Sequence, residues 1–202
     1  LDQHGGGIWT YGGTFSNVTV RDNRVYNLAA NYYGGGLYNE RPVCTVMVSR
    51  IVGNVISNLS ASRYCSGGGA MGGVFTNCVI SSNRIDGGFM ESTSGGAGVG
   101  GWWATVYGSL ISHNVNQQGY GGGFASGNIY SSTVAVNQAK YGGGILLNNG
   151  TISNCVVVSN SYAGGYTGGV LMFPVNASAQ VKMFDTLVAG SVNPINISGS
   201  GA

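Results

Sequence analysis

The chain has 202 residues, of which 43% are hydrophobic and only 7% are charged, with a formal net charge of +2. Disordered proteins are usually rich in charge and poor in apolar residues, so this composition excludes a largely disordered chain. The basic residues are scattered, which argues against a nucleic-acid-binding face. No apolar run approaches the roughly 18 residues of a membrane span.

The chain begins at Leu1 without a Met and without a signal peptide. We therefore expect either a mature product or a segment of a longer protein. Its length fits one domain over residues 1–202.

Seven glycine-rich triplets, each followed by an apolar residue, recur along the chain. They start at Gly5, Gly34, Gly67, Gly96, Gly121, Gly142 and Thr167. The spacings of 29, 33, 29, 25, 21 and 25 residues indicate stacked repeats whose loops differ in length. The longest loops are expected between residues 54 and 67 and between residues 87 and 94.

Between the triplets, a short alternating run ends at an asparagine, as in residues 17–23 and 77–83. The asparagines are Asn23, Asn54, Asn83, Asn114, Asn137 and Asn160. Three positions earlier lies an aliphatic residue, and five positions earlier lies a mostly small one, so both share one face of a strand. In the last repeat we place Asp185, Leu187 and Gly190 in these columns. The asparagine column predicts an interior ladder of side-chain amides at a bend.

These repeats predict an all-β fold, a right-handed, single-stranded parallel β-helix of about seven coils. A coil of this length cannot bury a core alone, but stacked coils can. A leucine-rich repeat would need regular Leu positions, helical repeats would need a 3.6-residue period, and propeller blades are longer, at about 40 residues.

The pattern of a glycine triplet followed by a strand ending in N-C-x-[IV]-x-x-N resembles β-helix repeats of bacterial surface proteins. Asn77–Asn83 carries the second half of the pattern, and Gly68-Gly69-Ala70 approximates the first. The resemblance is to polymorphic outer-membrane proteins and autotransporter adhesins. It implies a secreted or cell-surface location and specifies architecture more than activity, because the same fold serves lyases, hydrolases and tailspikes.

Aromatic residues are the first candidates for binding a ligand. His4, Tyr33, Tyr120, Tyr141 and Tyr166 each precede a triplet, and the pairs Trp9–Tyr11 and Trp102–Trp103 add further aromatics. Stacked rings on a flat face can bind a sugar chain, although they can equally stack on one another and cover a turn. The candidate ligand-binding residues are Tyr33, Tyr120, Tyr141, Tyr166, Trp102 and Trp103.

Catalysis has fewer candidates. Glycoside hydrolysis needs two carboxyl groups about 5–9.5 Å apart, and Asp86 and Glu91 are the near pair, with Arg84 beside them. A solvated pair of loop charges is the plainer interpretation of these residues. The two histidines lack the spacing of zinc ligands, so we expect no metal and no cofactor.

Four cysteines add one open question. Cys78 and Cys155 fall in the same small inward column, three coils apart, so we expect buried free thiols. Cys44 and Cys65 flank one long coil, and the sequence leaves a disulfide between them undecided.

The sequence favours a non-catalytic extracellular or cell-surface module for adhesion or for binding a polysaccharide or a host or surface protein. Two alternatives stay open. One is a polysaccharide lyase or glycoside hydrolase of the β-helix fold, or a fragment of one. The other is a self-assembling fibre segment that associates through its coil ends or strand edges.

Overall fold

A computed structural model describes residues 3–27, 31–40, 44–58, 65–87, 95–101, 103–164, 166–174 and 178–197. The candidates Glu91 and Trp102 lie outside these ranges, as does much of the two longest loops.

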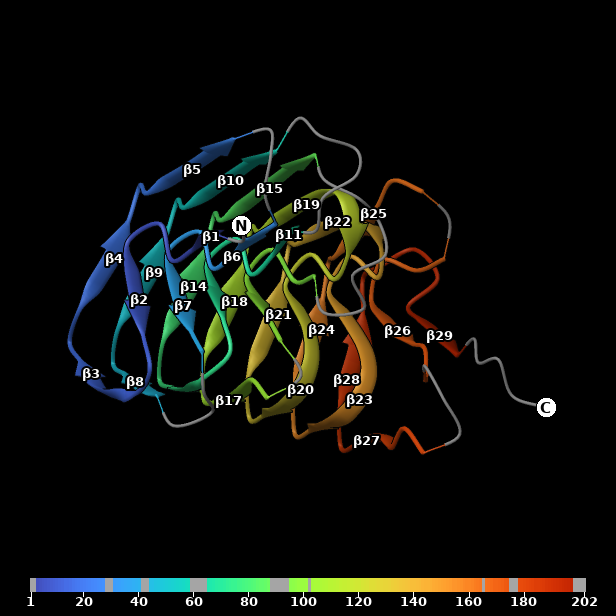
Figure 1. The fold of residues 1–202 in the computed structure, drawn as a ribbon. Coiled ribbons are helices and arrows are strands. Elements are labelled where there is room, and N and C mark those ends of the chain that lie inside the picture. The colour runs from blue at the N-terminus through green and yellow to red at the C-terminus, as the bar shows by residue number, and fades with distance from the viewer. Residues whose placement is uncertain are drawn as a thin grey trace.

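The chain is an all-β parallel solenoid of about six turns, which confirms the expected fold class (Figure 1). Counting the triplets gives about seven coils. The seventh repeat supplies β28 (Leu187–Ala189) to one sheet, but no described residue of that repeat joins the six-stranded sheet. The described structure contains no helix, and therefore none that could span a membrane.

Four parallel sheets run along the solenoid. The three-stranded sheet contains β1 (Gln3–His4), β6 (Tyr32–Tyr33) and β11 (Cys65–Ser66). The six-stranded sheet contains β5 (Arg24–Asn27), β10 (Val55–Asn58), β15 (Arg84–Gly87), β19 (Val115–Tyr120), β22 (Gln138–Tyr141) and β25 (Ser161–Tyr162). The seven-stranded sheet contains β4 (Thr19–Arg21), β9 (Arg50–Val52), β14 (Val79–Ser81), β18 (Leu110–Ser112), β21 (Thr133–Ala135), β24 (Val156–Val158) and β28.

The largest sheet has a path of nine strands with four more attached. The path contains β2 (Ile8–Thr10), β7 (Leu37–Asn39), β12 (Ala70–Met71), β16 (Val99–Gly100), β20 (Phe124–Tyr130), β17 (Thr105–Tyr107), β13 (Val74–Thr76), β8 (Cys44–Met47) and β3 (Gly13–Ser16). The attached strands are β23 (Ile145–Ser153), β26 (Val170–Met172), β27 (Val181–Phe184) and β29 (Ile195–Ile197).

The aliphatic column forms the spine of the seven-stranded sheet. In register order it contains Val20, Ile51, Ile80, Ile111, Val134, Val157 and Val188. The expected alignment of the last repeat is therefore wrong by one residue, because Val188 and not Leu187 pairs with Val157. Thr186 replaces Asp185 in the small column, and Ser191 replaces Gly190 in the ladder, where its hydroxyl accepts the backbone N–H of Asn160.

The asparagine ladder is confirmed. Nδ2 of Asn54 donates to Oδ1 of Asn83, and Nδ2 of Asn83 donates to Oδ1 of Asn114, each at 3.0 Å. The second proton of Nδ2 of Asn83 goes to the Ile51 carbonyl at 2.9 Å. The side-chain amides of Asn54, Asn83, Asn114 and Asn137 are fully buried, and each of them both donates and accepts hydrogen bonds. They therefore satisfy one another's hydrogen-bonding groups inside the solenoid.

Two columns of left-handed residues bend each turn. One precedes the small column and includes Asn17 and Asn77, and the other precedes the ladder and includes Asp22, His113 and Val136. Residues of these types tolerate positive φ unequally, since Asn and Asp accept it far better than β-branched Val. His113 and Asp22 thus serve as bend residues of different turns.

Candidate functional site

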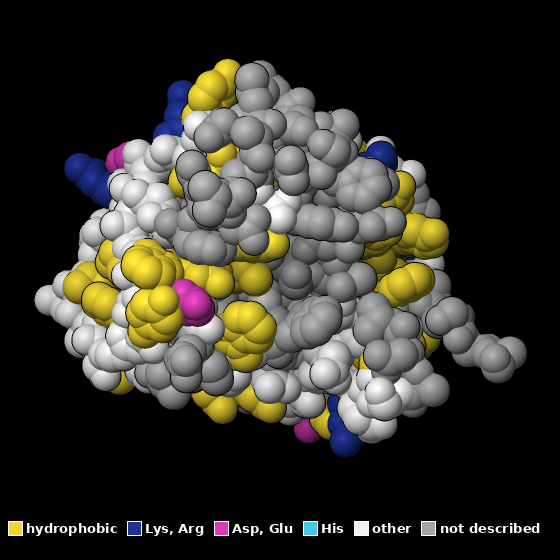
Figure 2. Space-filling view, viewed as in Figure 1, with side chains coloured by type: hydrophobic (Ala, Val, Ile, Leu, Met, Phe, Trp, Pro, Cys, Tyr) yellow, Lys and Arg dark blue, Asp and Glu magenta, His cyan; other side chains and the backbone are white. Residues whose placement is uncertain are grey.

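A group of aromatic side chains lies on the outer face of β2 and β7. Trp9 is 52% exposed and Tyr11 is 54% exposed, and their ring centroids lie 5.1 Å apart with a tilt of 59°. Figure 2 shows hydrophobic side chains gathered around one acidic side chain in this region. Large apolar side chains exposed together on a soluble protein usually mark a contact with a ligand or partner.

Strand register brings the other members of this group together. Trp9 pairs with Tyr38 across β2 and β7, and the backbone N–H of Glu40 donates to the Thr10 carbonyl at 3.1 Å. A Cβ atom placed on Gly72 would lie 2.1 Å from Nε1 of Trp103 and 2.9 Å from the carbonyl oxygen of Asn39, so the indole approaches the Asn39–Glu40 segment. We call the exposed residues Trp9, Tyr11, Glu40 and Trp103, together with the buried Tyr38, the aromatic surface.

Sequence reasoning placed only part of this surface. Trp103 and the Trp9–Tyr11 pair were recognised as aromatic candidates, whereas Tyr38 and Glu40 were missed. The signal was present, because aligning the triplets at Gly5 and Gly34 places Trp9 beside Tyr38 and Tyr11 beside Glu40.

Three of the four candidate tyrosines form a stack. The ring centroids of Tyr120 and Tyr141 lie 4.9 Å apart with a tilt of 30°, and those of Tyr141 and Tyr166 lie 5.3 Å apart with a tilt of 53°. Tyr120 and Tyr141 are half-buried against a small apolar cluster of Ala125, Leu146 and Leu171. Burial, followed by the nearby Tyr141 and Tyr166, raises the pKa of Tyr120. These rings therefore cover a satellite core, and their tilts do not make one flat plane.

Tyr33 is not part of this stack. It pairs with His4 and Ser66 in the three-stranded sheet, and its ring lies 6.1 Å from that of Tyr38, beside the aromatic surface. The expected single column of tyrosines is thus divided between two regions of the solenoid.

Two of the three catalytic candidates, Arg84 and Asp86, form an ion pair. Nε of Arg84 bonds to Oδ1 of Asp86 within β15, so the carboxylate is engaged by its own neighbour. Glu91 lies outside the described residues. Across the described ranges, no group of three or more His, Cys, Asp or Glu side chains is placed to hold a metal ion.

All four cysteines are buried free thiols, as expected for Cys78 and Cys155. Cys44 and Cys65 belong to different sheets and different apolar clusters, so the structure contains no disulfide between them. Burial raises the pKa of Cys44, Cys78 and Cys155, which keeps these thiols protonated and unreactive.

A second surface feature begins at an irregularity in β19. The pairing of β19 with β22 shifts between Asn116 and Tyr120, because Asn116 faces Ala139 and Tyr120 faces Tyr141. The buried Asn116 amide holds the bulge, since Oδ1 accepts the Gly119 N–H at 3.0 Å and Nδ2 donates to the Tyr120 carbonyl at 3.1 Å. The bulge turns Gln117 and Gln118 outward, and bulges often re-aim side chains at functional sites.

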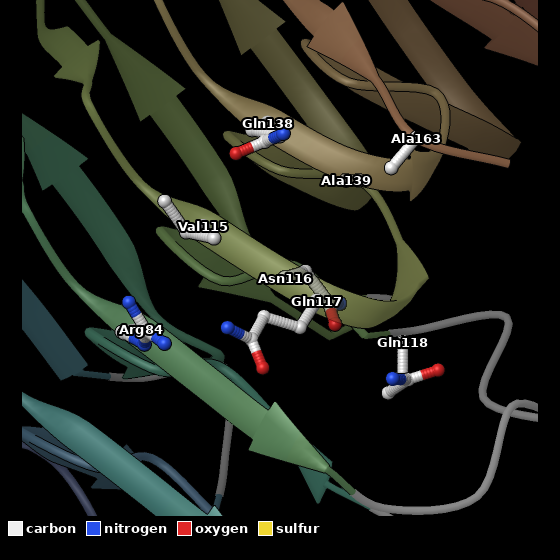
Figure 3. A pocket seen from close by; sticks show the side chains of 8 residues that line it. All are labelled: Arg84, Val115, Asn116, Gln117, Gln118, Gln138, Ala139 and Ala163. Atoms are coloured by element: carbon white, nitrogen blue, oxygen red, sulfur yellow. The ribbon is translucent and has the colours of Figure 1, made fainter.

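These side chains border a groove of about 340 Å³ on the six-stranded sheet. Its lining comprises Arg84, Val115, Asn116, Gln117, Gln118, Gln138, Ala139 and Ala163. Figure 3 shows the Gln117 side chain extending from β19 toward Arg84 on β15. We call this the glutamine groove. Sequence reasoning missed it, although Asn114 lies seven residues before its next triplet and Asn137 only five, a difference of the two residues that form the bulge.

Comparison of the chain with protein-family models, with curated proteins and with solved structures finds no match.

Proposed function

We propose that the protein is a non-catalytic, extracellular or cell-surface module that binds carbohydrate through the aromatic surface. The observation that carries the proposal is the adjacent pair Trp9 and Tyr11, each more than half exposed on a rigid sheet. Burial of exposed aromatic rings against a ligand is favourable, because it removes their apolar surface from water.

The chemistry of the surface suits a sugar. Ring faces of Trp9 and Trp103 can pack on the C–H face of a pyranose, and the Glu40 carboxylate can accept hydrogen bonds from its hydroxyl groups. Because parallel strands fix these groups from below, little conformational entropy is lost on binding. The resemblance to repeats of bacterial surface adhesins supports the proposed location.

Binding is favoured over hydrolysis by where the described carboxylates lie. Glu40 follows β7 and Asp86 is paired within β15, while Asp22 and Asp185 occupy left-handed bends of the first and last repeats. Hydrolysis would require two of them within about 10 Å across one bound sugar.

The test is affinity electrophoresis and calorimetry with a panel of neutral polysaccharides, comparing the parent chain with Trp9→Ala and Tyr11→Ala. We expect one of these glycans to bind and each variant to lose at least about tenfold in affinity. Phe184→Ala is the matched control, because Phe184 is 53% exposed on the distant strand β27.

Three results would overturn the proposal. Release of new reducing ends from any glycan would show catalysis. Equal loss of binding in Phe184→Ala and Trp9→Ala would show that the aromatic surface is not the site. Capture of a protein ligand in place of any glycan would reassign the surface to protein adhesion.

A further inference from the structure

The outer face of the six-stranded sheet carries a row of basic side chains. Side chains alternate along each strand, so the inward residues Val25, Ile85 and Ala139 leave their neighbours facing outward. The outward neighbours include Arg24 on β5, Arg84 on β15 and Lys140 on β22.

These three strands alternate with others in the sheet, whose order is β25-β22-β19-β15-β10-β5. Arg24 and Arg84 both pair with Val55, one from each side, so they occupy the same register position two strands apart. Adjacent strands lie about 4.8 Å apart, so Arg24 and Arg84 lie about 9.6 Å apart along the solenoid axis. Lys140 lies on the second strand beyond Arg84, two residues further along its strand than Gln138, which shares the register position of Arg84.

The sheet face has a positive balance. Its described strands contain three basic residues, Arg24, Arg84 and Lys140, and one acidic residue, Asp86. Asp86 bonds Nε of Arg84 and thereby orients the guanidinium, which has five N–H donors in all. The Lys140 ammonium lies 5.5 Å from the centre of the Tyr141 ring, which holds it beside the tyrosine stack.

The glutamine groove lies within this row. It extends from Arg84 past Gln117 to Gln138 on β22, the strand that also carries Lys140, and reaches Ala163. Each glutamine amide offers donors and an acceptor, which matches a sugar hydroxyl that both donates and accepts. An arginine fork matches a carboxylate or a sulfate group.

We propose that the glutamine groove and the basic residues Arg24, Arg84 and Lys140 form a binding site for an acidic polysaccharide that lies along the solenoid axis. Because Arg24 and Arg84 lie about 9.6 Å apart along the axis, acidic groups about two sugar units apart on such a chain can meet both of them. A nucleic-acid strand is the competing anionic polymer, and the experiment below tests it directly. This site lies on a different sheet from the aromatic surface and goes beyond the function proposed above.

The experiment measures binding of the full chain to polygalacturonate, dextran sulfate, neutral dextran and a single-stranded oligonucleotide, at low and at raised salt. We expect one or both acidic polysaccharides to bind in a salt-sensitive way, and the two distinguish carboxylate from sulfate recognition. Arg84→Gln and Lys140→Gln should each weaken binding by about tenfold, and Gln117→Ala should weaken it without changing its salt dependence.

Lys182→Gln and Arg50→Gln are the matched controls, because both are exposed basic residues on other sheets. Thermal unfolding checks that each variant is folded, and Trp9→Ala should leave the acidic ligand bound, which separates this site from the aromatic surface. The proposal is overturned if neither acidic polysaccharide binds, if neutral dextran binds as tightly, if the oligonucleotide binds more tightly, or if the control variants lose as much affinity as Arg84→Gln.

Discussion

Gly69 lies directly against the ladder amide of Asn83. A Cβ atom at Gly69 would stand 2.6 Å from Nδ2 of Asn83 and 2.7 Å from the Gly98 carbonyl oxygen. The third glycine of other triplets meets its own ladder residue in the same way, as Gly36 does with Asn54 and Gly144 with Asn160. The two landmarks of the repeat are therefore one packing unit, in which the glycine leaves room for the amide.

This contact predicts that Gly69→Ala destabilises the fold by about 1–3 kcal/mol, because an added methyl group overpacks the interior. Shortening the partner should relieve the clash, so Gly69→Ala should cost less in an Asn83→Ser background. A double-mutant cycle of urea unfolding measures the coupling, expected at about 0.5–3 kcal/mol. Strict additivity of the two changes would contradict the contact.

Removing one ladder amide should cost more. Asn83→Leu deletes two donated bonds and leaves the backbone N–H of Asn54, which donates to Asn83 Oδ1 at 3.0 Å, without its acceptor. Since each unsatisfied buried group costs about 1–3 kcal/mol, we expect a loss of about 3 kcal/mol or more in the free energy of unfolding. Asn149→Ala, at an exposed amide, should lower it by less than about 1 kcal/mol in the same chemical denaturation experiment.

A valine in a left-handed bend offers a route to stabilisation. Val136 has a φ of 57° and is 49% exposed, so its β-branched side chain is strained without contributing much to the core. Val136→Asn should raise the free energy of unfolding by about 1 kcal/mol. Val156→Asn, on the extended strand β24, should lower it instead. Thermal unfolding of the two variants side by side distinguishes a bend-specific effect from a general one.

The buried thiols predict a loss of stability in alkali. Burial raises the pKa of Cys78 and Cys155 above the ordinary value of about 9, although backbone hydrogen bonds partly offset the rise. The unfolded chain therefore releases thiol protons at a lower pH than the folded chain, so the contribution to stability is complete below about pH 9 and falls as the pH rises further.

The variant that tests this carries Cys78→Ser and Cys155→Ser. Ser109 and Ser132 occupy the same column in neighbouring turns, where their hydroxyls bond the carbonyls of Tyr107 and Tyr130 at 2.7 Å, so serine is accommodated. We expect urea unfolding of the double variant to show a shallower decline above pH 9 than the parent. Parallel declines would mean that other groups cause the alkaline loss.

The fold was predictable because its determinants repeat. The small and aliphatic columns lie at fixed offsets from each ladder residue, and a glycine triplet recurs once per turn, so one sequence shows the pattern several times. The last repeat was misaligned by one residue because its ladder position holds Ser191 instead of an asparagine, and the sequence indicated Gly190 as the substitute. With a φ of 63°, Gly190 instead occupies the left-handed position just before the ladder, and Ser191 supplies the hydrogen bond.

The surface sites were less predictable, because each depends on a local feature that occurs in a single turn and is not repeated in the others. The glutamine groove requires two extra residues in β19; the spacing from Asn114 to Gly121 contains them, but only the pairing with β22 shows that they form a bulge. Trp103 reaches the aromatic surface from a later turn over a glycine, Gly72, that belongs to no triplet. The tyrosines preceding the triplets were recognised, but their division between a buried stack and Tyr33 follows from the apolar cluster beneath them.

The ladder also has a direction. From Asn23 to Asn137 each Nδ2 donates to the Oδ1 of the ladder asparagine in the following turn, and each Oδ1 from Asn54 to Asn160 accepts from the preceding turn. The amide dipoles consequently add along the axis, and the two ends of the ladder differ, with the Asn23 amide at one end and the Ser191 hydroxyl, which follows Asn160, at the other. Two such rods can continue each other's ladder only when both point the same way, so the interior imposes a head-to-tail order on any end-to-end contact.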